Sequence, residues 1–292
     1  MKQILRRLCP SRTKGYLLAA GCLLLLSSCS ALLSTTFIEP TVANLQKQAD
    51  LELVCEGSPS YLLMIDSMIA SDPKSKSLLI AGSQAYSGYI GAMGECGYPK
   101  ERIQTVSKKA NEYGAALLAR TIHLQKVTGI DQLEDRLSQL NRSDVPPLFW
   151  GALAVLNWIQ QQQGAPAAMA ELVTVEKVMA RLLELDETYQ AGAPHLFFGG
   201  YYATRPPMFG GDPDKSREHF EKALAISGRQ FLLIQVTYAE TLARQLFDKK
   251  LHDALLREVL DFSLQSAPEY NLSNQIAKRK AKRLLEDDYF SE

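Results

Sequence analysis

From Thr41 onward, apolar residues recur at intervals of three and four positions along most of the chain. This spacing puts them on one side of a helix, so it predicts amphipathic α-helices that each bury one face. The alternating pattern of half-buried strands joined by hairpin turns is absent from the sequence. The pattern therefore predicts an all-α fold. Its clearest helical segments are Glu101–Lys126, Val173–Tyr189, Pro213–Ser227, Phe231–Phe247 and Asp253–Leu264.

The breaks between these helices follow a similar style. Asp212 stands before Pro213, which is the order of a capping residue followed by a first helical position with a preset φ. The helices expected to begin near Leu172, Pro213 and Lys250 follow at intervals of about 37–41 residues, close to the roughly 34 of a tetratricopeptide unit. We therefore expect an irregular tetratricopeptide-like helical repeat, an α-solenoid or superhelical bundle of about four degenerate units with a concave surface.

One predicted helix differs from the others. Pro147–Ile159 is apolar on every side and holds both tryptophans of the chain, Trp150 and Trp158. A helix without a polar face has to be covered all round by other elements. We expect this helix at the centre of the packing.

The first 28 residues have a different composition from the rest of the chain. They hold five basic residues and no acidic one, and an apolar run of about 11 residues extends from Tyr16 to Leu26. A basic start before a short apolar stretch is typical of an export signal, and the run is too short to span a bilayer permanently. A retained helical anchor is the alternative interpretation.

The apolar run ends in Leu26-Ser27-Ser28-Cys29, which resembles the cleavage box of bacterial lipoproteins. In that resemblance the chain is cut before Cys29, whose thiol receives a diacylglycerol and whose new amino group receives a third acyl chain, for example palmitate. Several acyl chains hold a protein firmly, whereas one binds a membrane only weakly. A cut before Cys22 would leave an apolar core of about five residues, shorter than a signal needs. Ser30 after the cysteine resembles the pattern that favours the outer membrane, and the inner membrane stays open.

These observations divide the chain into a signal peptide over residues 1–28, a lipidated tether over 29–40 and a helical-repeat domain over 41–292. Without the signal the net charge is about −5, which suits the periplasm and argues against nucleic acid as a partner. Cys55 and Cys96 then remain in an oxidising compartment, which permits a disulfide between them. Two buried free thiols are the alternative.

Four segments have a distinctive sequence: Leu148–Ile159, Leu182–Pro206, Gly210–Gly228 and Ala277–Phe290. Together they resemble a known family, the TatT or T component of TRAP-associated transporters. The resemblance covers nearly the whole mature chain in the expected order, and its most specific part runs from Asp186 to Gly228.

The resemblance implies a periplasmic, lipid-anchored scaffold that binds the substrate-binding P component of a TRAP-type transporter. It also implies a homo-oligomer, for instance a trimer, and a small apolar or organic-acid ligand that passes between the two components. Two other uses of a tetratricopeptide-like lipoprotein stay open: a scaffold for envelope assembly and a regulator of cell-wall enzymes.

The sequence contains no complete motif for catalysis, cofactor binding or metal binding. We therefore expect that the protein is not an enzyme and that it binds no cofactor and no metal. The segment Gly210–Ser216 lacks the glycine of a phosphate loop before Lys215 and the ligand spacing of a calcium loop. The four histidines show no metal-ligand spacing, and a nucleophile elbow of the type GxSxG does not occur. We interpret each histidine as a packing or surface residue.

An aromatic cluster is the strongest functional signal. Phe197 and Tyr201 would share one face of a helix, and Phe198 and Tyr202 the adjacent face. Such a wall could line a groove for an apolar ligand or a partner, with Arg205 available to a carboxylate, whereas plain packing between repeats is the alternative. The predicted groove residues are Trp150, Phe197, Phe198, Tyr201, Tyr202, Arg205 and Phe209.

Overall fold

The computed structural model describes residues 44–123 and 129–290, and these residues form helices joined by turns, with no strand among them. The all-α prediction is confirmed. The α-helices are α4 (Leu51–Ser71), α5 (Lys76–Met93), α6 (Lys100–Ile122), α7 (Ile130–Ser138), α8 (Val145–Gln160), α9 (Pro166–Asp186), α10 (Tyr189–Thr204), α11 (Pro213–Ile226), α12 (Leu233–Tyr238), α13 (Lys249–Asp261) and α14 (Asn271–Glu286). A π-helical turn, η5 (Ala239–Ala243), continues α12, and short 3₁₀ turns are η3 (Arg142–Asp144), η4 (Pro207–Phe209), η6 (Leu264–Ser266) and η7 (Pro268–Tyr270).

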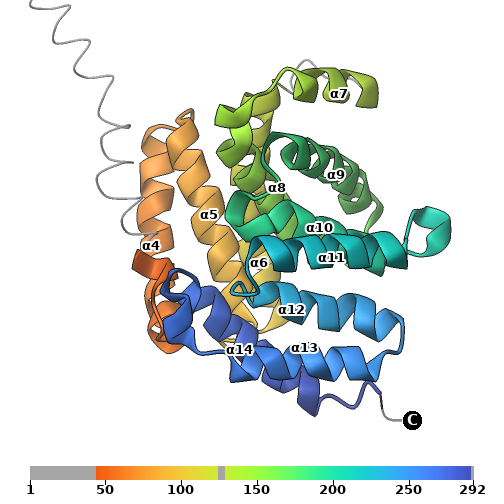
Figure 1. Ribbon diagram of the computed structural model, residues 1–292. Helices are drawn as coiled ribbons and strands as arrows, with labels where there is room; N and C mark the ends of the chain where they lie inside the picture. The colour runs from red at the N-terminus through yellow and green to blue at the C-terminus, as the bar shows by residue number, and fades with distance from the viewer. Residues whose placement is uncertain (1–43, 124–128, 291–292) are drawn as a thin grey trace, which may run out of the picture.

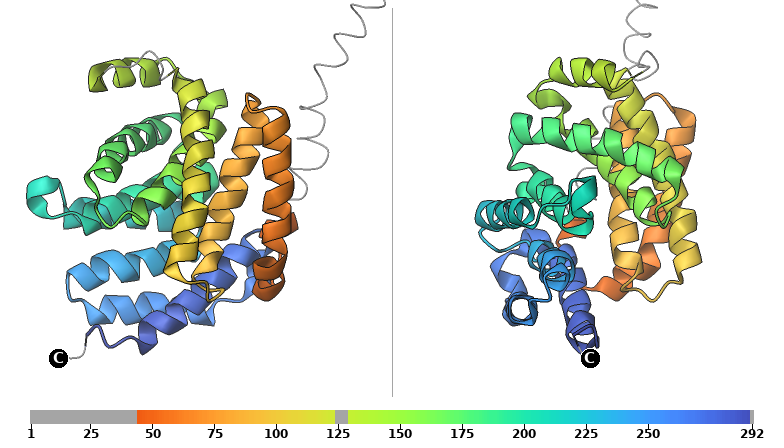
Figure 2. Two further views of the ribbon diagram at one scale, coloured as in Figure 1. Left: turned by 180° about the vertical axis from the view of Figure 1, so that it is seen from behind. Right: turned by 90° about the vertical axis from the view of Figure 1, so that its right-hand side faces the viewer.

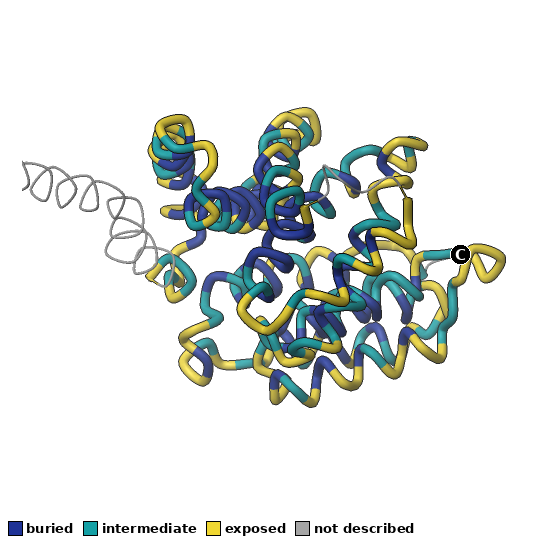
Figure 3. The backbone as a smooth tube through the Cα atoms, turned by 90° about the horizontal axis from the view of Figure 1, so that it is seen from above, coloured by how far each residue is buried: buried dark blue, intermediate teal, exposed yellow. Residues whose placement is uncertain are grey.

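Successive helices pack on one another, and the pair α10–α11 lies between two groups of helices (Figure 1). Helices α4 to α9 form one group, and α12 to α14 form the other at the opposite side of the pair. Buried positions lie on the inner sides of the helices and exposed positions on their outer sides, as amphipathic spacing requires (Figure 3). The tetratricopeptide-like character of the packing stays a prediction.

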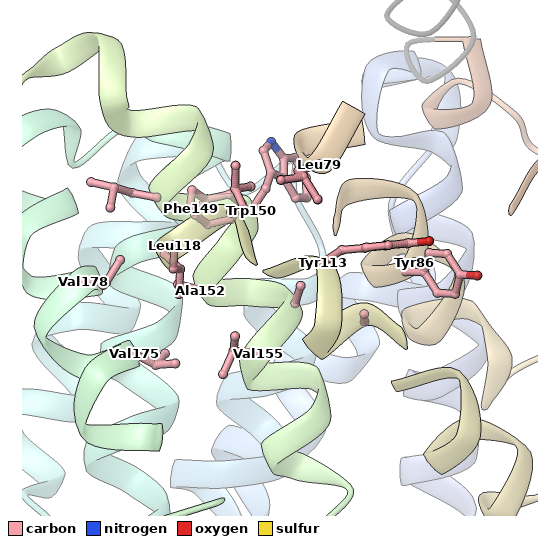
Figure 4. Packing of buried hydrophobic residues seen from close by; sticks show 14 of the residues in the cluster. Leu79, Tyr86, Tyr113, Leu118, Phe149, Trp150, Ala152, Val155, Val175 and Val178 are labelled. Atoms are coloured by element: carbon pink, nitrogen blue, oxygen red, sulfur yellow. The ribbon is translucent and has the colours of Figure 1, made fainter. Parts of the chain in front are cut away.

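Helix α8 lies at the centre of the larger hydrophobic cluster, as its all-apolar sequence predicts (Figure 4). It crosses α6 at a point where each helix has a glycine, Gly114 in α6 and Gly151 in α8. A Cβ atom at Gly114 would lie 2.7 Å from the carbonyl oxygen of Gly151 and 2.8 Å from Ala154 Cβ. The two backbones therefore approach more closely than any larger residue at this point would allow.

The first and last described helices meet. Leu272 and Ile276 of α14 share a small apolar cluster with Leu51 and Val54 of α4. Because these residues lie at opposite ends of the described chain, their contact joins the last helix to the first long one. Figure 2 shows α14 reaching the base of α4 and α5 from behind.

The basic side chains of α14 take part in this closure. Arg283 forms an ion pair of 2.6 Å with Glu95, which is mostly shielded from solvent, and Arg279 lies 3.4 Å from Glu52. Lys280 pairs with Glu240 beside the π-helical turn. These three basic side chains of α14 are therefore paired with acidic groups within the molecule.

Cys55 and Cys96 form a disulfide in the structure, with their Cα atoms 5.9 Å apart. The bridge joins α4 to the turn after α5, next to the cluster that receives α14. Of the two alternatives for these cysteines, the bridged one is therefore compatible with the fold.

None of the described helices is long and apolar enough to cross a membrane. The predicted signal peptide, Cys29 and the tether over 29–40 lie outside the described residues, as do the first three residues and the last two of the predicted domain 41–292. The division of the chain into these parts stays a prediction.

Replacing Gly114 by Ala should lower the free energy of unfolding by about 1–3 kcal/mol, because the new methyl group meets backbone at the crossing of α6 and α8. Urea unfolding followed by circular dichroism measures the change. Gly88→Ala in α5 is the matched control, since a Cβ there meets no atom within 4 Å, and it should be neutral or stabilising by up to about 1 kcal/mol. Equal effects of the two variants would contradict the close crossing.

Replacing both Cys55 and Cys96 by Ser should lower the free energy of unfolding by about 2–4 kcal/mol, since the bridge closes a loop over a sequence separation of 41 residues. Adding a reductant should lower the free energy of unfolding of the unmodified protein and leave that of the double variant unchanged. Two titratable thiols in unreduced, unfolded protein would show that the bridge does not form.

Candidate functional site

The aromatic side chains of α10 form a continuous wall. The rings of Phe197 and Tyr201 lie 5.5 Å apart, and those of Phe198 and Tyr202 lie 5.9 Å apart, as expected for residues one helical turn from each other. Phe197 also contacts Phe198 edge-to-face at 5.0 Å. Phe198 is buried, whereas the other three side chains are partly exposed, so the wall has a buried root and an accessible edge.

A left-handed turn of the backbone near the start of α10 precedes the wall. Gln190, Ala191 and Gly192 have φ values of 48°, 59° and 81° in succession. Gly192 is buried, and a Cβ there would lie 3.3 Å from Ile226 of α11, so the position requires glycine for both its conformation and its packing. This turn sets the direction in which α10 leaves α9.

Helix α11 adds an imidazole to the wall. The His219 ring stacks on Tyr202 with centroids 5.7 Å apart and lies 5.3 Å from the Phe198 ring. The two helices approach closely beside it, because Ser216 donates a hydrogen bond of 2.7 Å to the carbonyl of Gly199, and a Cβ at Gly199 would overlap the Phe220 ring. As the sequence predicts, Asp212 caps α11, accepting hydrogen bonds from the N–H groups of Asp214 and Lys215.

Arg205 lies at the end of the wall. Its guanidinium stands 4.1 Å from the centre of the Tyr201 ring and donates hydrogen bonds to the Tyr201 hydroxyl and, at 3.3 Å, to the carbonyl of Phe209. Burial raises the pKa of Tyr201, and the negative charge of Glu176 in α9 adds to this, while Arg205 opposes it. A guanidinium has five N–H donors, so Arg205 can also meet an anion.

The loop after α10 carries the most exposed apolar side chains near the wall. Met208 is 82% exposed and Phe209 66% exposed. Three hydrogen bonds of 2.9–3.1 Å fold this loop back on Pro206 and Pro207, where the donors are the N–H groups of residues 209, 210 and 211. The loop projects from the side of the molecule in opposite views (Figures 1 and 2). It is a short, fixed tip, and we call Pro206–Phe209 the loop tip.

The structure brings six of the seven predicted groove residues together, and the seventh, Trp150, lies deeper in the hydrophobic cluster that also contains Phe198. Trp150 is buried on α8, where its ring lies 5.0 Å from Phe149, and Phe149 in turn lies 5.2 Å from Tyr189 (Figure 4). Trp150 thus contributes to the core under the wall.

The sequence did not indicate a histidine pair that lies at the root of the wall. Nδ1 of His195 lies 2.9 Å from Nδ1 of His219, and Nε2 of His195 lies 3.1 Å from a carboxylate oxygen of Glu187. The side chain of His195 is only 4% exposed. The two histidines are 24 positions apart, a separation that carries no spacing signal, and only the expectation that α10 and α11 are neighbours could have suggested the pair.

Among residues 44–123 and 129–290, no group of three or more histidine, cysteine or acidic side chains could hold a metal ion. The wall itself offers apolar contact, ring stacking and the Arg205 guanidinium. Such a set can bind the apolar part of a ligand or partner and orient a carboxylate beside it.

Two comparisons with known proteins bear on this site. The family model described as TRAP transporter T-component matches residues 47–290, which include the wall, the loop tip and both histidines. The chain is also similar to an uncharacterized protein of Treponema pallidum (strain Nichols), with 24% identity over 258 residues that cover 82% of this chain and 79% of the relative. The chain therefore belongs to the family of TRAP transporter T components, which are periplasmic accessory proteins of TRAP transport.

Proposed function

We propose that this protein is held at a membrane through lipidated Cys29 and binds the substrate-binding P component of its transporter with the aromatic wall and the loop tip. The exposure of Met208 and Phe209 on a fixed loop is the observation that carries the proposal. Large apolar side chains exposed next to one another are typical of protein contacts.

The fixed backbone of the loop tip supports this role. A contact that is already ordered before binding loses little conformational entropy on association, so its buried area contributes more to affinity. Phe209 is also linked to the wall, because its carbonyl accepts a hydrogen bond from Arg205. Contact at the tip would therefore place the partner beside Tyr201 and the accessible edge of the wall.

The wall also suits a small apolar or organic-acid ligand that passes between the two components. Its aromatic edge would bind the apolar part, and Arg205 would orient a carboxylate. No side-chain carboxylate forms an ion pair with Arg205 in the described part of the chain, which supports a free donor for such an anion.

Self-association, for instance as a trimer, is also part of the proposal. Exposed apolar side chains on α4 support it, namely Leu53, Leu63 and Met64. Outer-membrane placement rests on Ser30 alone. Membership of the T-component family favours transport over envelope assembly or regulation of cell-wall enzymes.

Replacing Met208 and Phe209 together by Ser should weaken binding of the P component at least tenfold, about 1.4 kcal/mol, because exposed anchors at an interface centre carry much of the affinity. Biolayer interferometry with the mature, detergent-solubilised protein measures the Kd. Ile130→Ser at the start of α7 is the control, since it removes an exposed apolar side chain, 53% accessible, outside the wall, the loop tip and the α4 surface. An unchanged Kd for the double variant, or an equal loss for the control, would contradict docking at the tip.

Cys29→Ala should release the protein from membranes, because no acyl chain could then be attached. Fractionation of cells that express each form measures the distribution. Ser30→Ala, next to the cysteine, should leave the protein in the membrane fraction and controls for local changes near the cleavage site. A Cys29→Ala variant that still sediments with membranes would refute the lipid anchor.

A further inference from the structure

The hydrogen bonds of the histidine pair at the root of the wall determine which ring nitrogens carry protons. Nε2 of His195 lies 3.1 Å from the Glu187 carboxylate, which can only accept, so this nitrogen carries a proton. In neutral His195 the other nitrogen, Nδ1, is then bare. The 2.9 Å contact between the two Nδ1 atoms is a hydrogen bond that His219 donates to His195.

One added proton can enter this arrangement without breaking it. If His195 becomes an imidazolium, its charge lies next to Glu187 and its Nδ1–H becomes the donor. His219 then accepts at Nδ1, so its single proton now lies on Nε2 where it had been on Nδ1. The bond between the helices survives, with its direction reversed.

A second proton cannot be accommodated. Both Nδ1 atoms would then carry hydrogen and point at each other over 2.9 Å, without an acceptor between them and with a positive charge on each ring. Like charges at this separation repel strongly in a partly buried site. The contact between His195 and His219 has to break when the pair takes up two protons.

The charged groups around the pair are consistent with these protonation states. On α11, Lys222 and Glu218 flank His219 and are bonded to each other at 2.8 Å, while Glu187 before α10 faces His195. Burial lowers the pKa of His219 to about 4, with further lowering by the charges of His195 and Lys222, and Glu218 acts in the opposite direction. Helix α12, which also packs on α10 and α11, presents Tyr238 to Phe220 and Arg217.

The broken contact would change the wall directly. His219 stacks on Tyr202 and lies against Phe198, so a movement of its ring changes the surface that these two residues form. We propose that the His195–His219 pair is an acid-sensitive positioning device that holds the aromatic wall in its binding form when singly protonated or neutral and releases it when doubly protonated. This inference rests on the proposed binding function of the wall.

The first test uses the mature chain alone. Nuclear magnetic resonance of histidine and tyrosine rings should show the His219 ring becoming an imidazolium with a midpoint at a pH of about 4. The Tyr202 ring signals should move with the same midpoint. A His219 that is already an imidazolium at neutral pH, or a Tyr202 ring that does not follow the His219 titration, would overturn the inference. Neither result depends on the P component, so failure here is separate from failure of the docking proposal.

The second test uses the variant His195→Gln. A glutamine amide oxygen can accept from the Nδ1–H of His219 whether or not that ring is charged. The unmodified protein should lose at least tenfold in affinity for the P component between pH 7 and pH 4, whereas His195→Gln should change less than threefold. The P component is the same in both measurements, so its own pH dependence cancels.

His252→Gln provides the matched control, because His252 is a second buried histidine, on α13, that contacts Asp253 away from the wall. This variant should keep the full pH response. An equal pH response of His195→Gln and the unmodified protein would refute the device. If His252→Gln also lost the pH response, the response would come from general destabilisation of the fold in acid, and the device would likewise be refuted.

Discussion

The close crossing of α6 and α8 is the contact on which the rest of the structure depends. Two glycines, Gly114 and Gly151, let the backbones approach until a carbonyl oxygen of one helix stands where a side chain of the other would begin. Most of the α8 side chains can then be buried, as its apolar sequence requires. The stacking of α9 on α8, and of α10 after it, follows from where this crossing places α8.

The contact between α14 and α4 limits how the helices can be arranged. An open superhelix exposes its two ends, but here Leu272 and Ile276 cover part of α4, and Arg283 reaches Glu95. The described ends of the chain therefore stabilise one another. The α10–α11 pair lies between the two groups of helices, and its loop tip stays at the outside.

The aromatic wall combines buried side chains with a partly exposed edge. Phe198 and the buried His195 hold α10 against α11, as core residues do, while the edge formed by Phe197, Tyr201 and Tyr202 stays partly exposed. The exposed tip with Met208 and Phe209 continues this edge. The proposed contact with other components of the transporter would use this surface, and the chain's membership of the T-component family is consistent with that use.

The features that the sequence alone determined are those set within one helix or one turn. The helical spacing, the Asp212 cap of α11 and the stacking of Phe197 on Tyr201 follow from 3.6 residues per turn and local hydrogen bonds. Tertiary structure decided which helix faces met. Trp150 lies in the core apart from the wall, and His195 meets His219 across 24 residues, because both outcomes depend on how α8, α10 and α11 pack. Local periodicity carries no information on that packing, since many arrangements of the same amphipathic helices would satisfy it equally well.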